Sequence, residues 1–165
     1  MLAADRVRKL LDYDPISGEF VWKSRSDAPR WNGKYAGKLA GRIDNHGYRQ
    51  IGLGGKFYRA HRLAWLYVHG EWPSAIDHID GNRRNNAISN LRLATIRQNR
   101  ANTGCRGRSG LKGAFWVSHI GKWRARISIK GKKKHIGVFG TAEEASRAYD
   151  AAAQEVYGEF ARVKR

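Results

Sequence analysis

Apolar and polar residues alternate one by one along residues 123–130, which is the period of a β-strand that buries one face. A glycine on each side of this run predicts turns into further strands over 115–119 and 133–139. Apolar residues then recur at helical spacing over 145–156, behind a Thr141–Glu144 capping box. This part of the chain therefore predicts a three-stranded antiparallel sheet packed on one helix, with the other face of the sheet bare and basic.

The first hundred residues show shorter and less regular patterns. Val7, Leu10 and Leu11 fall on one helical face, and Pro15 and Gly18 predict where that helix ends. A glycine pair between two apolar runs predicts a two-residue hairpin turn. The other predicted elements are strands at 19–23, 48–53, 56–60, 76–79 and 91–93, helices at 63–68 and from Thr95, and a loop-dominated stretch at 24–47.

These elements predict an α+β fold in two parts. Residues 104–112 are rich in glycine and polar residues and have no apolar period, which is typical of a linker. We therefore divide the chain into a first domain at 1–103, a basic linker at 104–112 and a second domain at 113–165. The arginines of the linker leave two interpretations open, a solvated tether or a segment that follows a phosphate backbone.

Charge changes this picture more than any other property of the composition. The 165 residues include 32 Lys and Arg against 14 Asp and Glu, a net charge of +18. Such a protein attracts polyanions, of which DNA and RNA are the most common; an anionic membrane surface or a ribosomal component are the alternatives. The single cysteine, Cys105, excludes an internal disulfide and a zinc site built on a Cys pair. No apolar run is long enough to span a membrane and no signal layout is present, so we expect an intracellular protein.

Candidate chemistry is concentrated in one central segment. Asp77 and His78 stand side by side, and amide side chains follow at Asn90 and Asn99. Because imidazole titrates near neutral pH, His78 can act as a general base on water. A carboxylate and an amide oxygen suit Mg²⁺, which commonly takes only one or two protein groups. On a regular strand, however, Asp77 and His78 would point to opposite faces.

Longer motifs around these residues resemble one family. The motifs are Tyr58-Arg59-Ala60-His61-Arg62-Leu63-Ala64-Trp65, Ile76-Asp77-His78-Ile79-Asp80-Gly81-Asn82, Asn86, Ser89-Asn90-Leu91-Arg92 and Asn99. They resemble the HNH endonucleases, in the subgroup related to phage homing enzymes. The resemblance implies a nuclease domain folded as a ββα-metal finger, and in this chain a β-rich extension precedes it. The resemblance implies that His78 is the general base, that Asn90 braces the loop between the strands, and that Asp77 and Asn99 bind one divalent ion. That ion would be Mg²⁺, with Mn²⁺ as the alternative, and Asn99 stands where many members have His.

The C-terminal part resembles a second family, the Apetala-two/ethylene-response-factor domains. The segments that carry this resemblance are 113–116, 121–127, 135–139, 142–153 and 158–161. That family lays its sheet in the DNA major groove, which implies that the basic face reads base edges. The expected DNA-binding residues are Arg124, Arg126 and Ser128, then Trp116, Lys133 and His135, with Lys132 and Lys134 either on phosphates or at a solvated hairpin tip. Four arginines near the first motif either clamp phosphates or are solvated, namely Arg83, Arg84, Arg97 and Arg100.

The sequence therefore predicts a metal-dependent, sequence-directed DNA endonuclease, a homing-type HNH nuclease or nickase. The C-terminal sheet would choose the site and the HNH finger would cut. The alternative is a non-catalytic DNA-binding protein or regulator that keeps an inactive HNH frame, and an RNA-binding structural protein ranks third. We expect double-stranded DNA as the partner, no membrane association, a monomer, and a phage or mobile-element protein that acts in the cytoplasm of a bacterial host.

Overall fold

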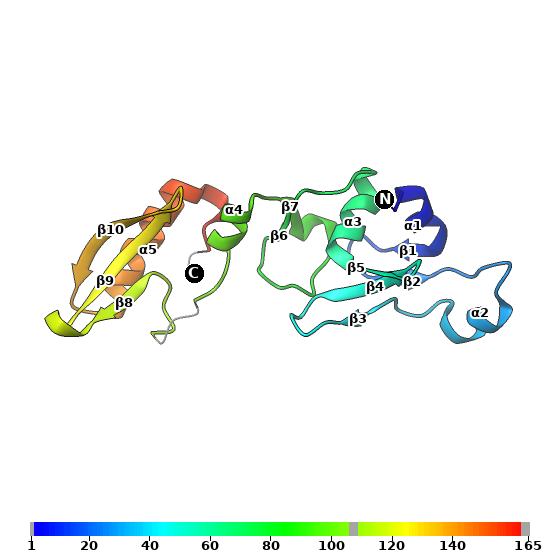
Figure 1. Cartoon of the computed structure of the whole chain (residues 1–165), viewed down its shortest axis with the longest axis horizontal. Helices are drawn as coiled ribbons and strands as arrows, with labels where there is room; N and C mark the ends of the chain where they lie inside the picture. Colours follow the sequence, from blue (N-terminus) through cyan, green and yellow to red (C-terminus); the bar gives the residue numbers. More distant parts are fainter. Residues whose placement is uncertain (1, 106–108, 163–165) are drawn as a thin grey trace. The chain divides into compact units, whose positions relative to one another are not determined.

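The protein forms two compact units, which are described separately below. The structure, a computed structural model, describes residues 2–105 and 109–162, so residues 106–108 of the predicted linker lie outside the described residues. The units are Met1–Thr95 and Ile96–Arg165 (Figure 1). Both mix short helices with small antiparallel sheets, which confirms the predicted α+β class.

The first unit contains short helices and three small antiparallel sheets in its described residues. Its helices are α1 (Ala4–Leu10), α2 (Pro29–Tyr35), α3 (Ala60–His69) and the single turn η1 (Ile88–Asn90). Its strands pair as β1 (Leu11–Tyr13) with β2 (Phe20–Trp22), as β3 (Arg42–Ile43), β4 (Arg49–Leu53) and β5 (Lys56–Arg59), and as β6 (Ile76–His78) with β7 (Leu91–Leu93).

One apolar core joins these elements. Val7 of α1, Phe20 of β2 and Leu63 of α3 are completely buried in it. Burial of each such side chain contributes roughly 2 kcal/mol relative to leaving it exposed. The same cluster includes Ile76 and Leu91, so the two strands that carry the predicted chemistry are anchored directly to the core.

The hairpin predicted at the glycine pair is confirmed. β4 pairs with β5 so that Leu53 stands opposite Lys56. Gly54 and Gly55 between them both adopt positive φ, 57° and 76°, as a two-residue type I′ turn requires. Gly70, with φ of 78°, ends α3 in the same left-handed region.

One prediction for the first unit is wrong. Leu11 does not belong to the first helix, because it opens β1 and pairs there with Trp22. The stretch 24–47 is dominated by loop, as predicted, but it also contains α2 and β3. Trp31 and Tyr35 of α2 stack four residues apart, with ring centroids at 5.2 Å, and such a pair supports a helix. Because glycines and polar residues surround this short helix, the sequence pattern did not predict it.

In the second unit, a three-stranded antiparallel sheet packs on one helix, as predicted. The strand order is β10 (Lys132–Phe139), β9 (Lys122–Ile129), β8 (Ala114–Val117), and the helix is α5 (Ala142–Tyr157). Ala125 of β9 and Ala145 of α5 are completely buried in the core they share. The capping box between Thr141 and Glu144 is confirmed, and Gly158 ends the helix.

The first unit is shorter than the predicted first domain, which extends to residue 103. The division lies between Thr95 and Ile96, just before α4 (Ile96–Ala101). Helix α4 contacts α5 and the turn η3 (Gly158–Phe160). The carbonyl of Ala101 also accepts a hydrogen bond from the ammonium group of Lys112. These contacts group the helix with the second unit.

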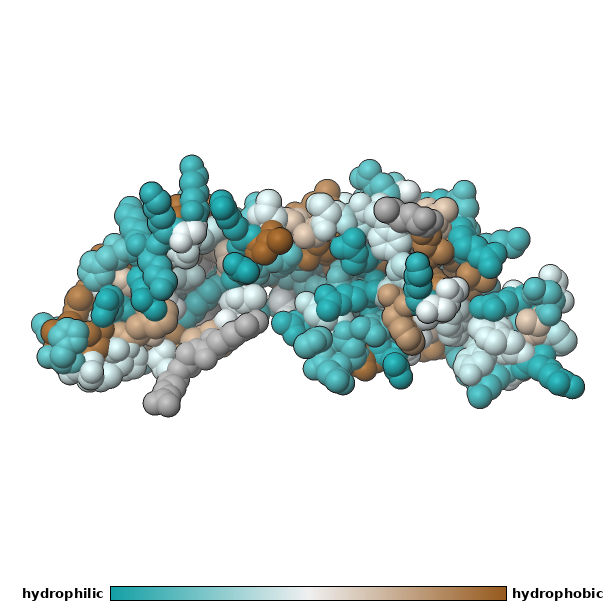
Figure 2. Space-filling model, viewed as in Figure 1, coloured by the Kyte–Doolittle hydropathy of each residue, from teal (hydrophilic) through white to brown (hydrophobic). Residues whose placement is uncertain are grey.

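Hydrophilic side chains cover much of each unit on the face shown in Figure 2. The lysines and arginines predicted to bind DNA are all exposed or half-buried, which leaves their charge accessible to a polyanion. None of the described helices is long and apolar enough to cross a membrane.

Candidate active site and nucleic-acid surface

The residues predicted to carry the chemistry of the first unit lie on two short strands and the loop between them. β6 pairs with β7 so that Asp77 stands opposite Arg92 and His78 opposite Leu91. All three residues of β6 are buried, which means that both faces of the strand are covered. Asp77 and His78 are therefore both enclosed by protein, each with its own partners.

The Asp77 carboxylate is held by a double hydrogen bond from one arginine. Arg92 Nε and Nη2 both donate to Asp77 Oδ2, at 3.0 and 2.8 Å. The Asp77 side chain is 6% exposed and that of Arg92 is 14% exposed, so the ion pair is shielded from water. A carboxylate offers about four lone pairs on its two oxygens, so this contact is compatible with a further ligand on the same group.

The His78 ring is packed among two other rings and one amide. Its Nε2 lies 3.3 Å from Asn86 Oδ1, and its ring centroid lies 4.9 Å from that of His61 and 6.1 Å from that of Tyr48. Burial lowers the pKa of His78 below its ordinary value, although the contact with Asn86 and two nearby carboxylates oppose the shift. The imidazole is thus neutral near pH 7, which is the form that accepts a proton from water.

Asn90 and Asp80 hold the loop between the strands in one conformation. Asn90 Oδ1 accepts from the Asp80 amide at 3.1 Å, and Asn90 Nδ2 donates to Asp80 Oδ1 at 3.0 Å and to the Asn85 carbonyl at 2.9 Å. Asp80 also accepts hydrogen bonds from Asn82 N and Asn85 Nδ2. Burial favours the neutral form of Asp80, but these hydrogen bonds outweigh it and lower the pKa of its carboxyl group.

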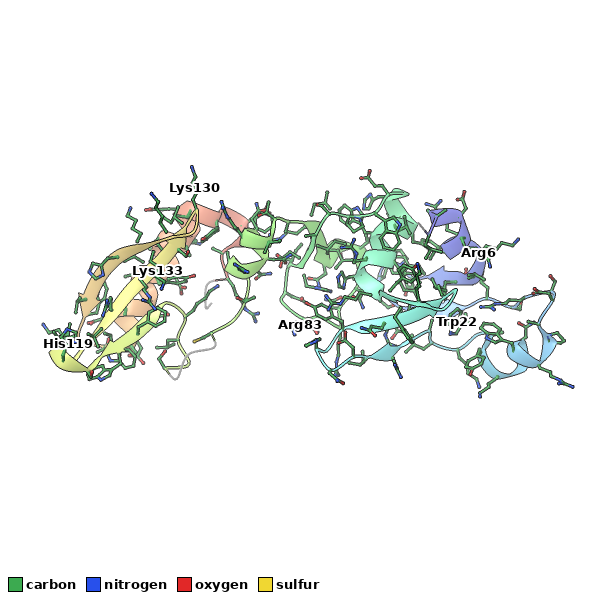
Figure 3. The ribbon with its side chains drawn as sticks, viewed as in Figure 1. Arg6, Trp22, Arg83, His119, Lys130 and Lys133 are labelled. Atoms are coloured by element: carbon green, nitrogen blue, oxygen red, sulfur yellow. The ribbon has the colours of Figure 1, made fainter. Side chains whose placement is uncertain are left out.

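The other residues predicted near the first motif divide between the two units. Arg83, labelled in Figure 3, is exposed in the loop after β6, in the first unit. Arg84 is exposed in the same loop. Asn99 lies half-buried on α4, and Arg97 and Arg100 are exposed on the same helix, in the second unit. No group of three or more His, Cys, Asp or Glu side chains that could hold a metal ion occurs among the described residues.

Sequence reasoning missed the ring that lies beside both histidines, Tyr48. Its centroid is 5.2 Å from that of His61, and the guanidinium carbons of Arg59 and Arg83 lie 4.2 and 5.0 Å from it. Arg83 also donates to the carbonyl of His46 at 2.7 Å. Nothing in the sequence marks Tyr48, because only the fold brings it to the histidine motif. Asn86 stands inside the motif, but its contact with His78 is visible only in the structure.

In the second unit, register places five of the predicted DNA-binding residues on one face of the sheet. Directly opposite residues share a face, and Arg126 pairs with His135 while Ser128 pairs with Lys133. Arg124 lies on this face by alternation along β9. Ala125 and Ile127, which alternate with these residues, are buried on the opposite face.

The other three residues predicted to bind DNA from this unit, Trp116, Lys132 and Lys134, stand opposite Trp123, Ile129 and Ile127, which alternate with the basic residues of β9. The rings of Trp116 and Trp123 meet at 5.3 Å. Lys132 and Lys134 are exposed near the β9–β10 hairpin. The residue that the sequence analysis left out is Phe115, which stands opposite Arg124 on the basic face and is 41% exposed.

Comparison with known proteins agrees with the geometry of the first unit. A family model for HNH endonucleases matches residues 58–101. Protein 3.8 of Escherichia phage T7 is 35% identical over 116 residues, which covers 66% of this chain and 95% of that protein. The chain carries an HNH endonuclease domain. The HNH endonuclease L560 of Acanthamoeba polyphaga mimivirus is 39% identical over 104 residues, 61% of this chain, and the chain spans about half of that relative (54%).

The second resemblance has one distant counterpart in these comparisons. The AP2-like ethylene-responsive transcription factor ANT of Arabidopsis thaliana is 33% identical over 147 residues, 78% of this chain but 26% of its own length. The Apetala-two-type assignment of the second unit therefore stays a prediction.

The HNH match includes His61, Asp77, His78, Asn90 and Asn99. The segments before Tyr58 that pack around His78 lie outside it.

Proposed function

We propose that this HNH protein is a divalent-metal-dependent endonuclease that hydrolyses phosphodiester bonds of double-stranded DNA at sites chosen by its second unit. The observation that carries the proposal is the buried imidazole of His78 beside Asp77 on β6, next to a loop braced by Asn90. The net charge of +18 supports a nucleic acid as the substrate.

His78 has the role of general base in this proposal. Its neutral imidazole takes a proton from the attacking water, while Arg92 keeps the Asp77 carboxylate in place. Asp77 and Asn99 are the groups that would hold the metal, because carboxylate and amide oxygens are the ligands that Mg²⁺ prefers. When bound, such an ion supplies positive charge where negative charge develops on the leaving oxygen. The products are a 5′-phosphate and a 3′-hydroxyl.

The basic face of the second unit supplies DNA recognition. Arg124 and Arg126 carry guanidinium groups that can bind guanine edges with two hydrogen bonds in the major groove. Lys133 and the hairpin lysines Lys132 and Lys134 carry compact charges suited to phosphates. Arg83 and Arg84 offer the same type of contact beside the motif. One active site per chain cuts one strand, so a monomer acts as a nickase.

A plasmid assay tests the proposal directly. Purified wild-type protein should convert supercoiled plasmid to nicked circles in Mg²⁺ or Mn²⁺, and EDTA should stop the reaction. His78→Ala should abolish nicking while DNA binding is retained, and His69→Ala, an exposed histidine of α3, should behave as wild type. Unchanged nicking by His78→Ala would refute the role of the base. DNA binding without any nicking by the wild type would favour a non-catalytic DNA-binding protein.

A binding assay tests the role of the sheet. Arg126→Ala should cost about 1–3 kcal/mol of affinity for the preferred site and reduce the preference over random DNA. Lys133→Ala, which lies on the same face as Arg126, should weaken binding to all sequences alike and reduce the salt dependence by about one charge. If both variants keep wild-type affinity and salt slope, the sheet does not contact DNA.

A further inference from the structure

The orientation of the Asn86 amide is fixed by two contacts. Asn86 Nδ2 donates to the Arg84 carbonyl at 3.1 Å, so Oδ1 is the amide atom that faces His78 Nε2 at 3.3 Å. An amide oxygen can only accept a hydrogen bond. His78 Nε2 must therefore carry the hydrogen, which leaves the lone pair of the neutral imidazole on Nδ1.

Asn86 is itself held by the N-terminal hairpin, which is formed by β1, β2 and the turn between them. The residue is 1% exposed, and its carbonyl accepts a hydrogen bond from the Tyr13 hydroxyl at 2.7 Å. Burial raises the pKa of Tyr13, so the hydroxyl keeps its proton as a donor. The turn between β1 and β2 also packs closely against Asn86, since a Cβ on Gly18 would lie 2.2 Å from the Asn86 carbonyl carbon. Ile88 N also donates to the Pro15 carbonyl at 3.1 Å.

We propose that Asn86 is a positioning residue that holds His78 in the tautomer with hydrogen on Nε2 and makes Nδ1 the proton-accepting atom. The proposal rests on the role of His78 as general base and deepens it. It also gives the N-terminal hairpin a function, because the segment that fixes Asn86 lies outside residues 58–101 that match the HNH family.

If Asn86 no longer fixes the tautomer, a part of the His78 population carries its hydrogen on Nδ1 and cannot accept a proton there, so the cleavage rate should fall. Loss of a side chain that orients a metal-binding histidine typically costs about 10- to 100-fold in affinity or activity, and we expect a loss of the same order for an oriented base. Here the loss should fall on the chemical step, because Asn86 is 1% exposed and its side chain contacts His78. A purely structural Asn86 would instead change stability and leave the tautomer as it is.

Nitrogen-15 spectra of the histidine side chains in the full chain, recorded without DNA at a pH where imidazole is neutral, report the tautomer. Wild type should show His78 with hydrogen on Nε2. Asn86→Leu, which has similar volume but no acceptor, should show a mixture, and Asn86→Asp, which keeps an acceptor oxygen, should restore the Nε2–H form. Hydrogen on Nδ1 in the wild type would overturn the proposal without any variant, even if Asn86→Leu fails to fold.

Single-turnover nicking completes the test. Asn86→Leu should cut about 10- to 100-fold more slowly with unchanged DNA affinity, and Asn86→Asp should recover most of the rate. Val7→Ala, a core change on α1 away from the site, controls for lost stability and should keep both tautomer and rate. A wild-type rate in folded Asn86→Leu overturns the inference while the proposed function stands. A wild-type protein that never nicks overturns the proposed function, and with it the catalytic part of this inference.

Discussion

The buried histidine next to the proposed base should make the first unit sensitive to acid. The His61 side chain is almost fully buried, and its Nδ1 has no hydrogen-bond partner within the part of the chain that the structure describes. Burial, then the neighbouring His78 and the guanidinium groups of Arg59 and Arg62, lower the pKa of His61 from 6.5 to about 3, against a smaller opposing effect of Asp44.

The sign and size of the effect follow from proton linkage. The unfolded chain takes up a proton at this residue below pH 6.5, whereas the folded unit does so only near pH 3. Stability is therefore complete above pH 6.5 and is lost progressively as the pH falls from there towards 3. At about 1.4 kcal/mol per pH unit, the fall from pH 7 to pH 5 costs about 2 kcal/mol through this one group.

Urea unfolding at pH 7 and pH 5, followed through amide signals of β6 and β7, measures this cost. His61→Leu removes the titrating ring and the buried unpaired nitrogen. Its loss of stability between the two pH values should be smaller than that of wild type by about 2 kcal/mol. Taking the difference between pH values cancels the change in packing, and His69→Leu serves as the exposed control. Equal losses in wild type and His61→Leu would refute the reasoning.

Three further predictions concern stability. Gly18→Ala should lower the melting temperature far more than Gly55→Ala: φ is near +75° at both positions, but only at Gly18 does a Cβ meet backbone, 2.2 Å from atoms of Asn86 and Ala87. Arg92→Leu should lower the urea-derived free energy of unfolding by about 3 kcal/mol, because the Asp77 carboxylate stays buried without its arginine, and adding Asp77→Leu should recover part of that loss. Thr141→Ala should cost the second unit about 1 kcal/mol in the same assay by removing the side-chain cap of α5.

The parts of the fold that were predictable are those whose signal is local. The alternation along β9, the capping box at Thr141 and the glycine pair of the β4–β5 hairpin each specify a conformation within a few residues. The errors come where a distant partner decides. Leu11 fits a helical face by spacing, but pairing with Trp22 and the apolar core draws it into a strand.

The candidate site divides in the same way. The sequence was sufficient to place Asp77 and His78 on a strand and Asn90 at the end of the loop that follows, because a strand–loop–strand unit is local. Tyr13 and Tyr48 could not be predicted, since a tertiary contact across more than half of the first unit brings Tyr13 to Asn86. Sequence patterns predict the candidate reacting groups, whereas the residues packed around them become visible only in the fold.

Burial of both faces of β6 encloses the two adjacent residues that we propose for one site. A strand exposed on one face would send either Asp77 or His78 into water, where its position would not be fixed. Here each side chain instead has its own partner, Arg92 for the carboxylate and Asn86 for the imidazole. Both partners come from the hairpin that β6 begins, one from β7 and one from the loop before it. The short Ile-Asp-His strand shows no alternation because neither face is exposed to solvent. Its two polar side chains therefore depend on hydrogen-bond partners from the rest of the first unit.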